Sequence, residues 1–390
     1  MNDGVIYLAG VAWDEIPGTD RKLASALAPE LEVLWVDPPV SAVRYARGLR
    51  AGKSWDLGVT GVAPGIARLQ VLVPPGTTRL FARDVISRYL SWKITTTVSA
   101  MSETFRATAI INASPEAVFP AGVKARRLFY ITDDWVAGAS LMGMSADRVR
   151  ERMRRNADDA DVTAAVSAGL AEKFGRVDLD VAVLPNGCTP FELTESTAAS
   201  PQPGDLPSGP LAGLVGQVNE RIDVSLVRAV ADAGTTVVVI GPRTERAPDA
   251  TIALDSLFAH PQVHWLGSKV PDVLPDYLSA FAVGMTPYVD NEFNRLSFPL
   301  KTLEYLGAGL PVVSSDLPSV RWLATEHVRT ASTPQGFAEL VGESCRNTSA
   351  TAAHERIAFA RQHSWGARGS QVRGLLGVDL VDNATTEHGG

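Results

Sequence analysis

Two side chains late in the chain, Lys301 and Glu304, have the types and the spacing to bind an anion and a sugar hydroxyl together. They lie in the stretch FPLKTLEYLGAGLPVVSSDLP, residues 298–318. Pro299 suits a helix start, because its φ is already helical and its missing N–H would have no intrahelical partner. A pair that served only helix stability would place the acid nearer the N-terminus than the base. The reversed order predicts an anionic ligand at this helix end.

A nucleoside diphosphate fits this layout. The free N–H groups of the first helical turn and the Lys301 ammonium would hold its phosphates. One turn deeper, Glu304 would accept hydrogen bonds from the two ribose hydroxyls. An exposed Lys–Glu pair that stabilises the helix slightly explains the same residues, and the local pattern does not decide between the two alternatives.

Two further segments of the second half could contact the same donor. Glycines up to Gly216 follow an apolar run and let a ligand approach the backbone, and Arg221 comes just before an expected helix. Arg243 lies in the loop after the next apolar run, where a base or phosphate often rests. Solvated arginines without a ligand are the alternative for both positions.

In the first half, polar and aromatic residues follow two expected strands. Asp133 and Asp134, in ITDDWVAG, could hydrogen-bond an acceptor hydroxyl as catalytic groups, with capping of the next segment as an equal alternative. Gly10 and Trp13 lie in the turn LAGVAWDEIPG, whose glycine permits close approach of a substrate. Gly10, Trp13 and Trp135 are therefore the predicted acceptor-binding residues.

Composition excludes several classes of protein. The chain has 390 residues, of which 45% are hydrophobic and 20% charged, which indicates a soluble globular protein of two domains. Its net charge of -7 argues against a nucleic-acid partner. Cys188 and Cys345 are its two cysteines, so we expect a reducing, cytoplasmic setting and no metal site. We expect neither an export signal nor a membrane span, and peripheral contact with the cytoplasmic face of a membrane stays open.

Short apolar runs alternate with helix-length segments, which is typical of βαβ units around a parallel sheet. A segment that combines aromatic and basic residues, 78–94, is expected to be a buried helix with arginines reaching the surface, against the alternative of contact with an acceptor or lipid headgroups. The expected strands of the first half are Val5–Leu8, Val33–Val36, Ala67–Val71, Ala109–Ile111, Leu128–Ile131, Val162–Val166 and Val181–Leu184. Its expected helices are Asp20–Ala28, Leu80–Phe105 and Ala146–Ala157.

The second half repeats this alternation after a segment rich in Pro, Ser, Thr and Gly. Its expected strands are Leu211–Val215, Thr235–Pro242, Val263–Leu266, Ala282–Pro287 and Leu310–Val313, and its expected helices are Asp223–Ala233, Pro271–Ala280 and the one from Pro299. We thus predict an α/β chain with an acceptor domain (1–195), a linker (196–210), a nucleotide-sugar domain (211–352), a C-terminal helix (353–378) and a disordered tail (379–390). Two alternatives stay open for this helix: it crosses back to the first domain, or it docks on the second.

The second half resembles the retaining glycosyltransferases of the GT-B fold, of the family-four type that includes teichuronic-acid and capsule sugar transferases. PLKTLEYLGAGLPVVSSDLP looks like the nucleotide-sugar motif of that family. Similar segments elsewhere are TAAVSAGLAEKFG, VLPNG, GQVNERID, WLGSKVPDVLPDYLSAFAVGMTPY and HSWGARGSQVRGLL. The resemblance implies two Rossmann-like domains with an interdomain cleft. It also implies metal-independent transfer of a hexose-type sugar, with retention, from a nucleoside-diphosphate sugar to a hydroxyl acceptor.

The resemblance also implies roles for single residues. Glu304 would bind the ribose, whereas the earlier glutamate of the family falls on Leu296. Glu292, as a catalytic residue, or Asn294, as a donor-binding one, would then replace that glutamate in holding the donor sugar. Arg221 is the nearest match to the basic pair that binds the diphosphate in this family.

Several readings of the activity stay open. The acceptor would be a polysaccharide, a lipid-linked molecule or a small natural product. A nucleoside-diphosphate sugar would act as co-substrate, with no bound cofactor. The alternatives to a transferase are a GT-B epimerase that acts on a free nucleotide sugar and a non-catalytic protein that binds nucleotide sugars.

Overall fold

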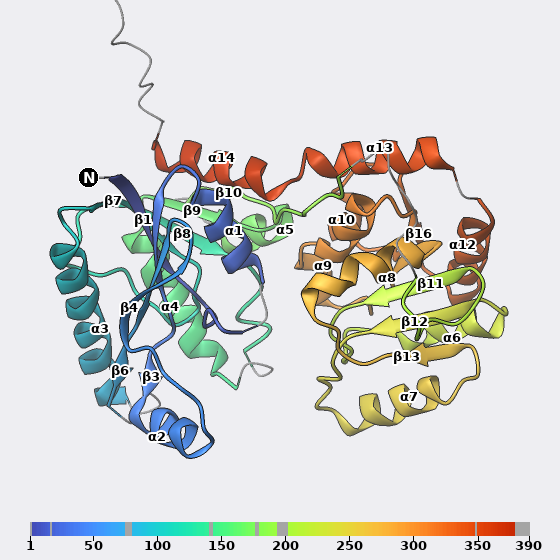
Figure 1. Ribbon diagram of the computed structural model, residues 1–390, viewed down its shortest axis with the longest axis horizontal. Coiled ribbons are helices and arrows are strands. Elements are labelled where there is room, and N and C mark those ends of the chain that lie inside the picture. The colour runs from blue at the N-terminus through green and yellow to red at the C-terminus, as the bar shows by residue number, and fades with distance from the viewer. Residues whose placement is uncertain are drawn as a thin grey trace, which may run out of the picture. The chain divides into compact units, whose positions relative to one another are not determined.

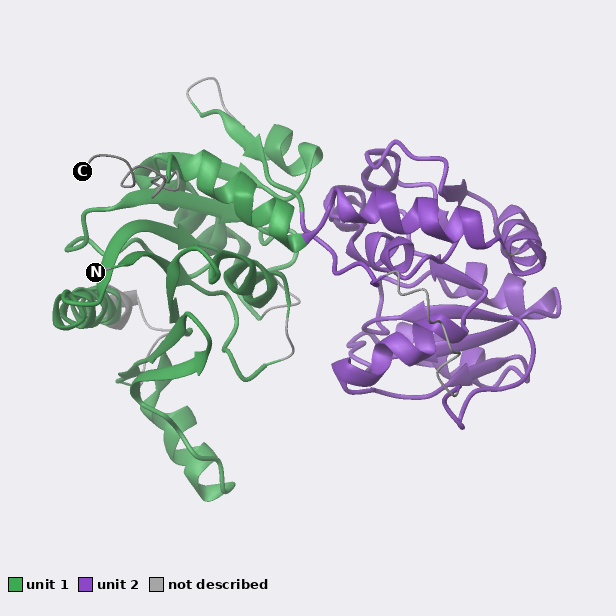
Figure 2. Ribbon diagram, turned by 45° about the horizontal axis from the view of Figure 1, so that its top comes forward, with its two compact units in different colours: residues 1–185, 365–390 green, residues 186–364 purple. Residues whose placement is uncertain are grey.

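A computed structural model of the protein divides into two compact units, each built on a mostly parallel sheet (Figures 1 and 2). Unit 1 comprises residues 1–185 and 365–390, and unit 2 comprises residues 186–364. The structure describes residues 2–15, 18–74, 80–139, 143–175, 179–192, 202–347 and 349–378, with no side chains for 80–84. The predicted tail, 379–390, and the first part of the predicted linker lie outside the described residues. The predicted α/β fold with two Rossmann-like parts is confirmed.

Unit 1 contains an eight-stranded sheet in the order β10-β9-β8-β7-β1-β2-β5-β4, in which only the edge strand β4 is antiparallel. All seven strands expected in this half are present, with ends that differ by a few residues. The strands are β1 (Asn2–Leu8), β2 (Glu32–Val36), β4 (Gly58–Ala63), β5 (Ile66–Gln70), β7 (Phe105–Asn112), β8 (Arg126–Ile131), β9 (Val162–Ala165) and β10 (Val181–Val183). A two-stranded sheet joins β3 (Val40–Ser41) to β6 (Leu72–Val73).

Unit 1 also contains helices, and one of them comes from the C-terminal part of the sequence. They are α1 (Thr19–Leu27), α2 (Ala42–Arg50), α3 (Leu80–Ala100), α4 (Ala146–Asp159), α5 (Ala168–Phe174) and α14 (Trp365–Leu376). α14 packs against α1: Arg373 forms an ion pair with Glu30 at 2.8 Å, and a side chain on Gly369 would lie 3.0 Å from the carbonyl oxygen of Ala26. The predicted single helix over 353–378 is wrong, because α13 (Ala350–Arg361) ends in unit 2 and α14 begins a separate helix in unit 1.

Unit 2 contains a six-stranded, all-parallel sheet in the order β13-β12-β11-β14-β15-β16. Its strands are β11 (Leu211–Val215), β12 (Thr236–Ile240), β13 (Val263–Trp265), β14 (Val283–Thr286), β15 (Val312–Ser315) and β16 (Val328–Ala331). β15 begins later than predicted, because Pro311 has no N–H to give to a sheet.

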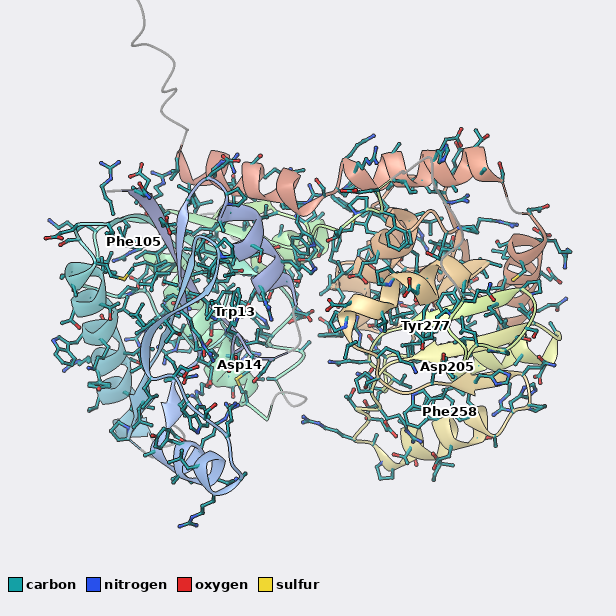
Figure 3. All side chains as sticks on the ribbon, in the orientation of Figure 1. Trp13, Asp14, Phe105, Asp205, Phe258 and Tyr277 are labelled. Atoms are coloured by element: carbon teal, nitrogen blue, oxygen red, sulfur yellow. The ribbon has the colours of Figure 1, made fainter. Side chains whose placement is uncertain are left out.

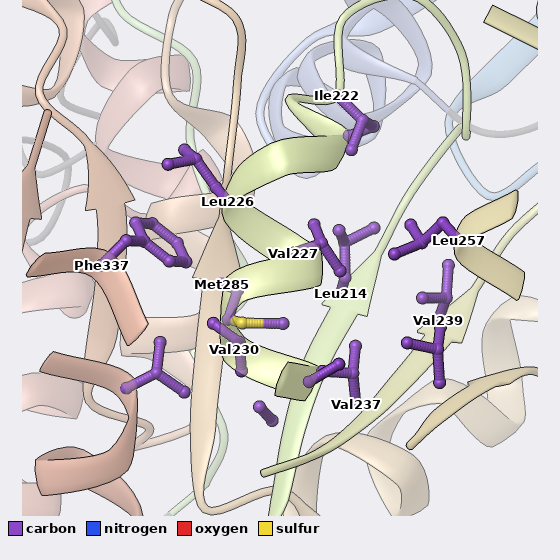
Figure 4. Close-up of a cluster of buried hydrophobic side chains, with 14 of the residues drawn as sticks. Leu214, Ile222, Leu226, Val227, Val230, Val237, Val239, Leu257, Met285 and Phe337 are labelled. Carbon is purple, nitrogen blue, oxygen red and sulfur yellow. The ribbon is translucent and has the colours of Figure 1, made fainter. Parts of the chain in front are cut away.

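The helices of unit 2 are α6 (Val224–Asp232), α7 (Pro248–Phe258), α8 (Leu274–Ala280), α9 (Glu292–Leu296), α10 (Leu300–Gly307), α11 (Pro318–Arg321), α12 (Pro334–Arg346) and α13, with the 3-10 turn η1 (Pro271–Val273) before α8. α6 buries Leu226, Val227 and Val230 against β11, β12 and β14 (Figure 4). Phe337 of α12 closes the same core (Figure 4). This apolar layer holds the strands in fixed register. It thereby fixes the positions of their carboxyl ends, which is where ligands bind in open α/β sheets.

Across the described part of the chain, no helix combines the length and the apolar character that a membrane crossing needs.

Candidate functional site

The helix that carries Lys301 and Glu304 is fixed to the neighbouring strand β11 by a buried side chain. The hydroxyl of Tyr305 accepts a hydrogen bond of 2.7 Å from the backbone N–H of Val215, the last residue of β11. The Tyr305 ring packs over β14 at Gly284, where an added Cβ would lie 2.4 Å from its Cγ atom. α10 can therefore approach the sheet closely because β14 carries no side chain at this position.

Lys301 and Glu304 form an ion pair, with 2.6 Å between Nζ and Oε2. Their side chains are 28% and 37% exposed, so both remain within reach of a ligand. Burial would lower the pKa of Lys301, but the Glu304 carboxylate and the Tyr288 hydroxyl outweigh burial and raise the pKa above its ordinary value. Lys301 is thus a cation at neutral pH, held in place by Glu304.

The Lys301 side chain lies over the turn that follows β11. Gly216 in that turn has φ +150°, and an added Cβ there would lie 3.6 Å from the Cε atom of Lys301. Gly241, at the end of β12, has φ +149°, and an added Cβ there would lie 1.7 Å from the carbonyl oxygen of Gly216. The ends of β11 and β12 therefore approach each other at two glycines, beside Lys301. Because glycine has no side chain, a ligand has room to approach the main-chain atoms here.

Arg221 and Asn294, two predicted donor residues, are in direct contact. Nε of Arg221 donates to Oδ1 of Asn294 at 2.8 Å, and Nδ2 of Asn294 donates to the Val289 carbonyl at 2.8 Å. The Arg221 guanidinium also lies 5.2 Å from the ring centre of Tyr288 and 4.8 Å from that of Phe293. These contacts orient a half-buried arginine at the loop that precedes α9.

Glu292 and Leu296 lie at the two ends of the short helix α9. Glu292 is exposed in its first turn, and Leu296 is half-buried in its last. The catalytic assignment of Glu292 stays a prediction.

Arg243 is held by acidic and aromatic partners of its own. Its guanidinium pairs with Glu245 and, at 2.6 Å, with Asp255, and it lies 5.8 Å from the ring centre of Trp265. These partners raise the pKa of Arg243 further above its ordinary value. The contacts explain this arginine without a ligand, and its donor-binding role stays a prediction.

In unit 1, the predicted acceptor residue Gly10 lines a cavity of about 400 Å³. The cavity lies at the carboxyl ends of β1, β2 and β7, between α3 and α4. The Gly10 turn is held by Asp20, whose Oδ2 accepts the Gly10 N–H at 2.9 Å and whose Oδ1 accepts the Tyr7 hydroxyl at 3.3 Å. Burial raises the pKa of Asp20 to about 6 against the lowering effect of these two hydrogen bonds.

Trp13, also predicted to bind the acceptor, is largely buried in the turn after β1 (Figure 3). Its ring packs edge-on against Trp35, and the Arg21 guanidinium lies over the Trp13 ring, 4.4 Å from the ring centre. Its backbone N–H donates to Asp37 at 2.9 Å. Through these contacts Trp13 is part of the packed structure that supports the Gly10 turn.

The two acids after β8 have different surroundings. Asp134 is fully buried, and its carboxylate accepts from the Ala137 N–H at 3.0 Å and from Lys173 Nζ at 2.6 Å. Asp133 is half-buried, and its Oδ1 accepts a hydrogen bond of 2.9 Å from the Asp134 N–H. Trp135 is buried against Phe129. The structure thus favours the capping alternative for Asp134, while the catalytic role of Asp133 stays a prediction.

Sequence reasoning missed three residues that shape these sites: Tyr305, Gly284 and Asp20. A lone glycine inside an apolar strand was a usable signal for Gly284, because it marks close approach of another group. The partners of Tyr305 and Asp20 are distant in sequence and left no local signal. Within the described ranges, His, Cys, Asp and Glu do not gather in threes that could hold a metal ion.

Comparison with known proteins finds a family model that matches part of the chain and solved structures that share its fold. Residues 214–347 match the family model of glycosyl transferases group 1. Over 142 residues the chain is 28% identical to TuaH of Bacillus subtilis, a protein assigned as a glycosyltransferase of teichuronic acid biosynthesis. That match covers 35% of this chain and 35% of the relative, so the chain spans about a third of the length of the curated relative it matches.

Solved structures match nearly the whole chain. The sucrose-phosphate synthase of Thermosynechococcus elongatus has a TM-score of 0.68 at 14% identity and covers 97% of this chain and 100% of its own. The UDP-forming trehalose-phosphate synthase of Burkholderia xenovorans, in complex with glucose-6-phosphate, also has 0.68 at 14%, with 96% and 100% covered. Anabaena HepE, in complex with UDP and glucose, has 0.62 at 15%, with 97% and 99% covered. At such identities the likeness shows the fold, which is the predicted GT-B fold.

Proposed function

We propose that this protein transfers a sugar from a nucleoside diphosphate to a hydroxyl acceptor, with retention of the anomeric configuration and without a metal ion. The match of residues 214–347 to the family model of glycosyl transferases group 1 supports this proposal. The donor binds unit 2 at the start of α10, and the acceptor binds unit 1 in the cavity at Gly10. The observation that carries the proposal is the Lys301–Glu304 pair beside the bare turn at Gly216.

The pair supplies the two groups that a nucleoside diphosphate needs. In the absence of a ligand, the Lys301 ammonium and the Glu304 carboxylate satisfy each other at 2.6 Å. A donor would replace this contact with two others, in which Lys301 meets a phosphate oxygen and Glu304 accepts from the ribose hydroxyls. The exchange gives Lys301 an opposite charge and Glu304 two hydrogen-bond donors, so the cost of breaking the ion pair is offset within the same site.

The chemical demand on the protein is to stabilise the diphosphate as it leaves. The bond between the anomeric carbon and the phosphate oxygen breaks, a bond from that carbon to the acceptor oxygen forms, and the acceptor proton passes to a phosphate oxygen. In this proposal, Lys301, the N–H groups at the start of α10 and Arg221 would hold the developing negative charge. A separate protein base is then unnecessary, which agrees with the occupied carboxylate of Asp134.

Binding measurements test the donor site directly. A thermal-shift panel of UDP, GDP, ADP and CDP would first select the nucleotide, since a ligand specific to the folded state raises the melting temperature. Calorimetry would then compare Lys301→Met and Glu304→Ala. We expect Lys301→Met to weaken the diphosphate at least about ten-fold and to leave the free nucleoside unaffected. We expect Glu304→Ala to weaken both.

Arg150→Met is the matched control, because Arg150 also forms an i,i+3 ion pair of 2.6 Å, with Asp147 on α4. Unchanged nucleotide affinity in both site variants would overturn the assignment. Product analysis separates the rival activities: an epimerase converts the nucleotide sugar without an acceptor, and a binding protein shows saturable binding without turnover.

A further inference from the structure

We propose that α2 and the chain that follows it dock unit 1 on a lipid surface with anionic headgroups. The residues concerned, 42–59, run from the start of α2 to the first residues of β4, and we call them the docking segment. α2 lies at the edge of unit 1, beside β3 (Figure 1). The inference is independent of the proposed function, because none of the residues assigned to the donor or the acceptor belongs to this segment.

Burial of its side chains does not account for the stability of α2. The helix has nine residues, and none of them is buried. Helices of this length are marginal in water by themselves, and most helices in proteins gain their stability by burying an apolar face. Ser41 caps the helix, since its Oγ accepts the Arg44 N–H at 3.2 Å, but this bond serves only one end. A partner that covered the exposed side would therefore stabilise α2.

The inner side of α2 is filled by the docking segment itself. The ring centres of Tyr45 and Trp55 lie 5.8 Å apart, and a Cβ added at Gly48 would lie 2.7 Å from Cζ2 of Trp55. The Lys53 ammonium lies 4.5 Å from the centre of the Trp55 ring. The helix and the loop after it thus pack on each other, which leaves the other side of α2 for a partner.

The docking segment exposes several large apolar side chains. Val43 and Leu49 of α2 are 53% and 50% exposed, and Leu57 and Val59 after it are 40% and 44% exposed. Single exposed apolar residues are common on proteins, whereas a group of them marks a contact surface. Four in so short a stretch indicate a surface that a partner covers.

The same segment carries an excess of positive charge. α2 contains Arg44, Arg47 and Arg50 and no acid, and residues 42–59 together hold four bases and one acid, a net charge of +3. Arg44 lies 3.7 Å from Glu15, whereas Arg47 and Arg50 are exposed and form no ion pair with any described residue. The partner of this surface should therefore be acidic.

Another arginine-rich helix of unit 1 shows the opposite arrangement. On α4, Arg150 pairs with Asp147 at 2.6 Å, and Arg154 pairs with Glu151 at 3.2 Å and with Asp158 at 3.0 Å. Exposed arginines without acidic partners are thus a property of α2 and do not follow from a high arginine content alone.

Cations that alternate with apolar side chains fit the surface of an anionic bilayer. Headgroup phosphates accept hydrogen bonds from arginines, while the apolar side chains enter the boundary with the acyl chains. Tyr45 and Trp55 are of the two residue types that are enriched at this depth. A nucleic acid presents phosphates without an apolar layer beneath them. An acidic protein is the alternative that the experiment must exclude.

Flotation of the full chain with lipid vesicles, without any nucleotide, tests the proposal. Vesicles of phosphatidylcholine with about 30% phosphatidylglycerol should bind the protein at least about ten-fold more tightly than pure phosphatidylcholine vesicles. Binding should weaken between about 0.05 M and about 0.5 M salt, because salt screens the attraction. Poly-glutamate, an acidic chain without acyl groups, should bind at least about ten-fold more weakly than the anionic vesicles.

Two double variants separate the charged from the apolar contribution. Arg47→Gln with Arg50→Gln should weaken binding to the anionic vesicles about thirty-fold, since each cation near such a surface contributes roughly 1 kcal/mol. Arg150→Gln with Arg154→Gln is the matched control and should have a much smaller effect, because it removes arginines that acids already pair.

Val43→Ser with Leu49→Ser keeps every charge and should still weaken binding at least about ten-fold, through the lost apolar burial. Ile252→Ser is its control, because Ile252 is 67% exposed on α7 of unit 2 and should not contact lipid. All these positions are exposed, and thermal melts confirm that the variants fold.

Equal binding to neutral and anionic vesicles, or unchanged binding in both α2 double variants, would overturn the proposal. Poly-glutamate binding as tight as vesicle binding, and insensitive to Val43→Ser with Leu49→Ser, would identify an acidic protein as the partner and would equally refute a lipid surface. These outcomes are distinct from a failure of the donor site, because no nucleotide is present.

Discussion

The hydroxyl of Tyr305 and the backbone N–H of Val215 are joined by a buried hydrogen bond of 2.7 Å that fixes the last turn of α10 to the end of β11. Val215 immediately precedes Gly216, over which the Lys301 side chain lies. One tyrosine thus sets the distance between the lysine and the turn at which we place the diphosphate. Donor affinity and stability of unit 2 should therefore respond together to changes at Tyr305.

Removing this hydroxyl with Tyr305→Phe should lower the free energy of unfolding by about 1–3 kcal/mol, because a buried N–H loses its partner. Nucleotide affinity should fall as well, since α10 is no longer tied to β11. Urea unfolding and nucleotide titration measure the two effects. Tyr277→Phe is the control: its hydroxyl bonds to the half-exposed Asp205, which keeps Lys269, so we expect a smaller loss and normal nucleotide affinity.

A methyl group at Gly284 should be destabilising. Gly284→Ala would place a carbon 2.4 Å from Cγ of Tyr305, so the ring or the strand must shift, at a cost of about 1–3 kcal/mol. In Gly374→Ala, on α14, the added methyl group meets no atom of the described residues within 4 Å, so the change should be neutral or stabilising, because alanine favours a helix. Equal melting temperatures for the two variants would contradict the close packing of Tyr305 on β14.

Sequence patterns predicted the parallel strands well because buried parallel strands are nearly continuous apolar runs. β11 begins and ends where the apolar run Leu211–Val215 does. Exposed or short elements were missed for the same reason: α2 buries no residue, and β4 is a glycine-containing antiparallel edge. Neither has the apolar signal on which the prediction depended.

The pH dependence of stability should reveal Asp20. The pKa of Asp20 in the folded protein, about 6, lies above its ordinary value of 3.8. Between these two pH values the folded protein therefore binds more protons than the unfolded chain. As the pH rises through this window, the contribution of Asp20 to the free energy of unfolding falls. Above about pH 6, burying the ionised Asp20 carboxylate lowers the free energy of unfolding by its full amount, about 3 kcal/mol. Asp20→Asn removes this titration.

The stability advantage of Asp20→Asn over wild type should therefore shrink by about 2 kcal/mol between about pH 7 and about pH 4. Other carboxylates titrate in both proteins and cancel in the difference. Urea unfolding at several pH values gives the comparison, and a difference that does not vary with pH would show that Asp20 titrates normally.

The carboxylate of Asp37 should be among the costliest to remove in unit 1. Asp37→Ala would leave the buried Arg68 guanidinium, the Trp35 indole N–H and the Trp13 N–H without this acceptor, which should cost about 3–5 kcal/mol. Asp14→Ala removes the half-exposed partner of the same arginine and should cost less than about 1 kcal/mol. Tryptophan fluorescence during urea unfolding can follow both variants, and similar losses would argue against the central position of Asp37.

The candidate site was predictable only where its residues are neighbours in sequence. Lys301 and Glu304 lie three apart, so helix geometry alone placed them on one face, and the structure pairs them. Arg221 meets Asn294 across two loops that leave different strands, and no local pattern indicates that contact. Arg243 was singled out from its loop position, whereas its partners Asp255 and Trp265 come from α7 and β13.

The return of α14 to unit 1 has a consequence for how the chain matures on the ribosome. Residues 186–364 form a continuous unit, whereas the sheet of residues 1–185 is missing one of its covering helices until residues 365–376 are synthesised. The N-terminal half therefore emerges from the ribosome first but completes its folding last. The surface of α1 that Arg373 and Gly369 cover stays exposed while the second half is synthesised. Premature termination between α13 and α14 would yield a complete unit 2 attached to a unit 1 that lacks α14, a product suited to capture by chaperones.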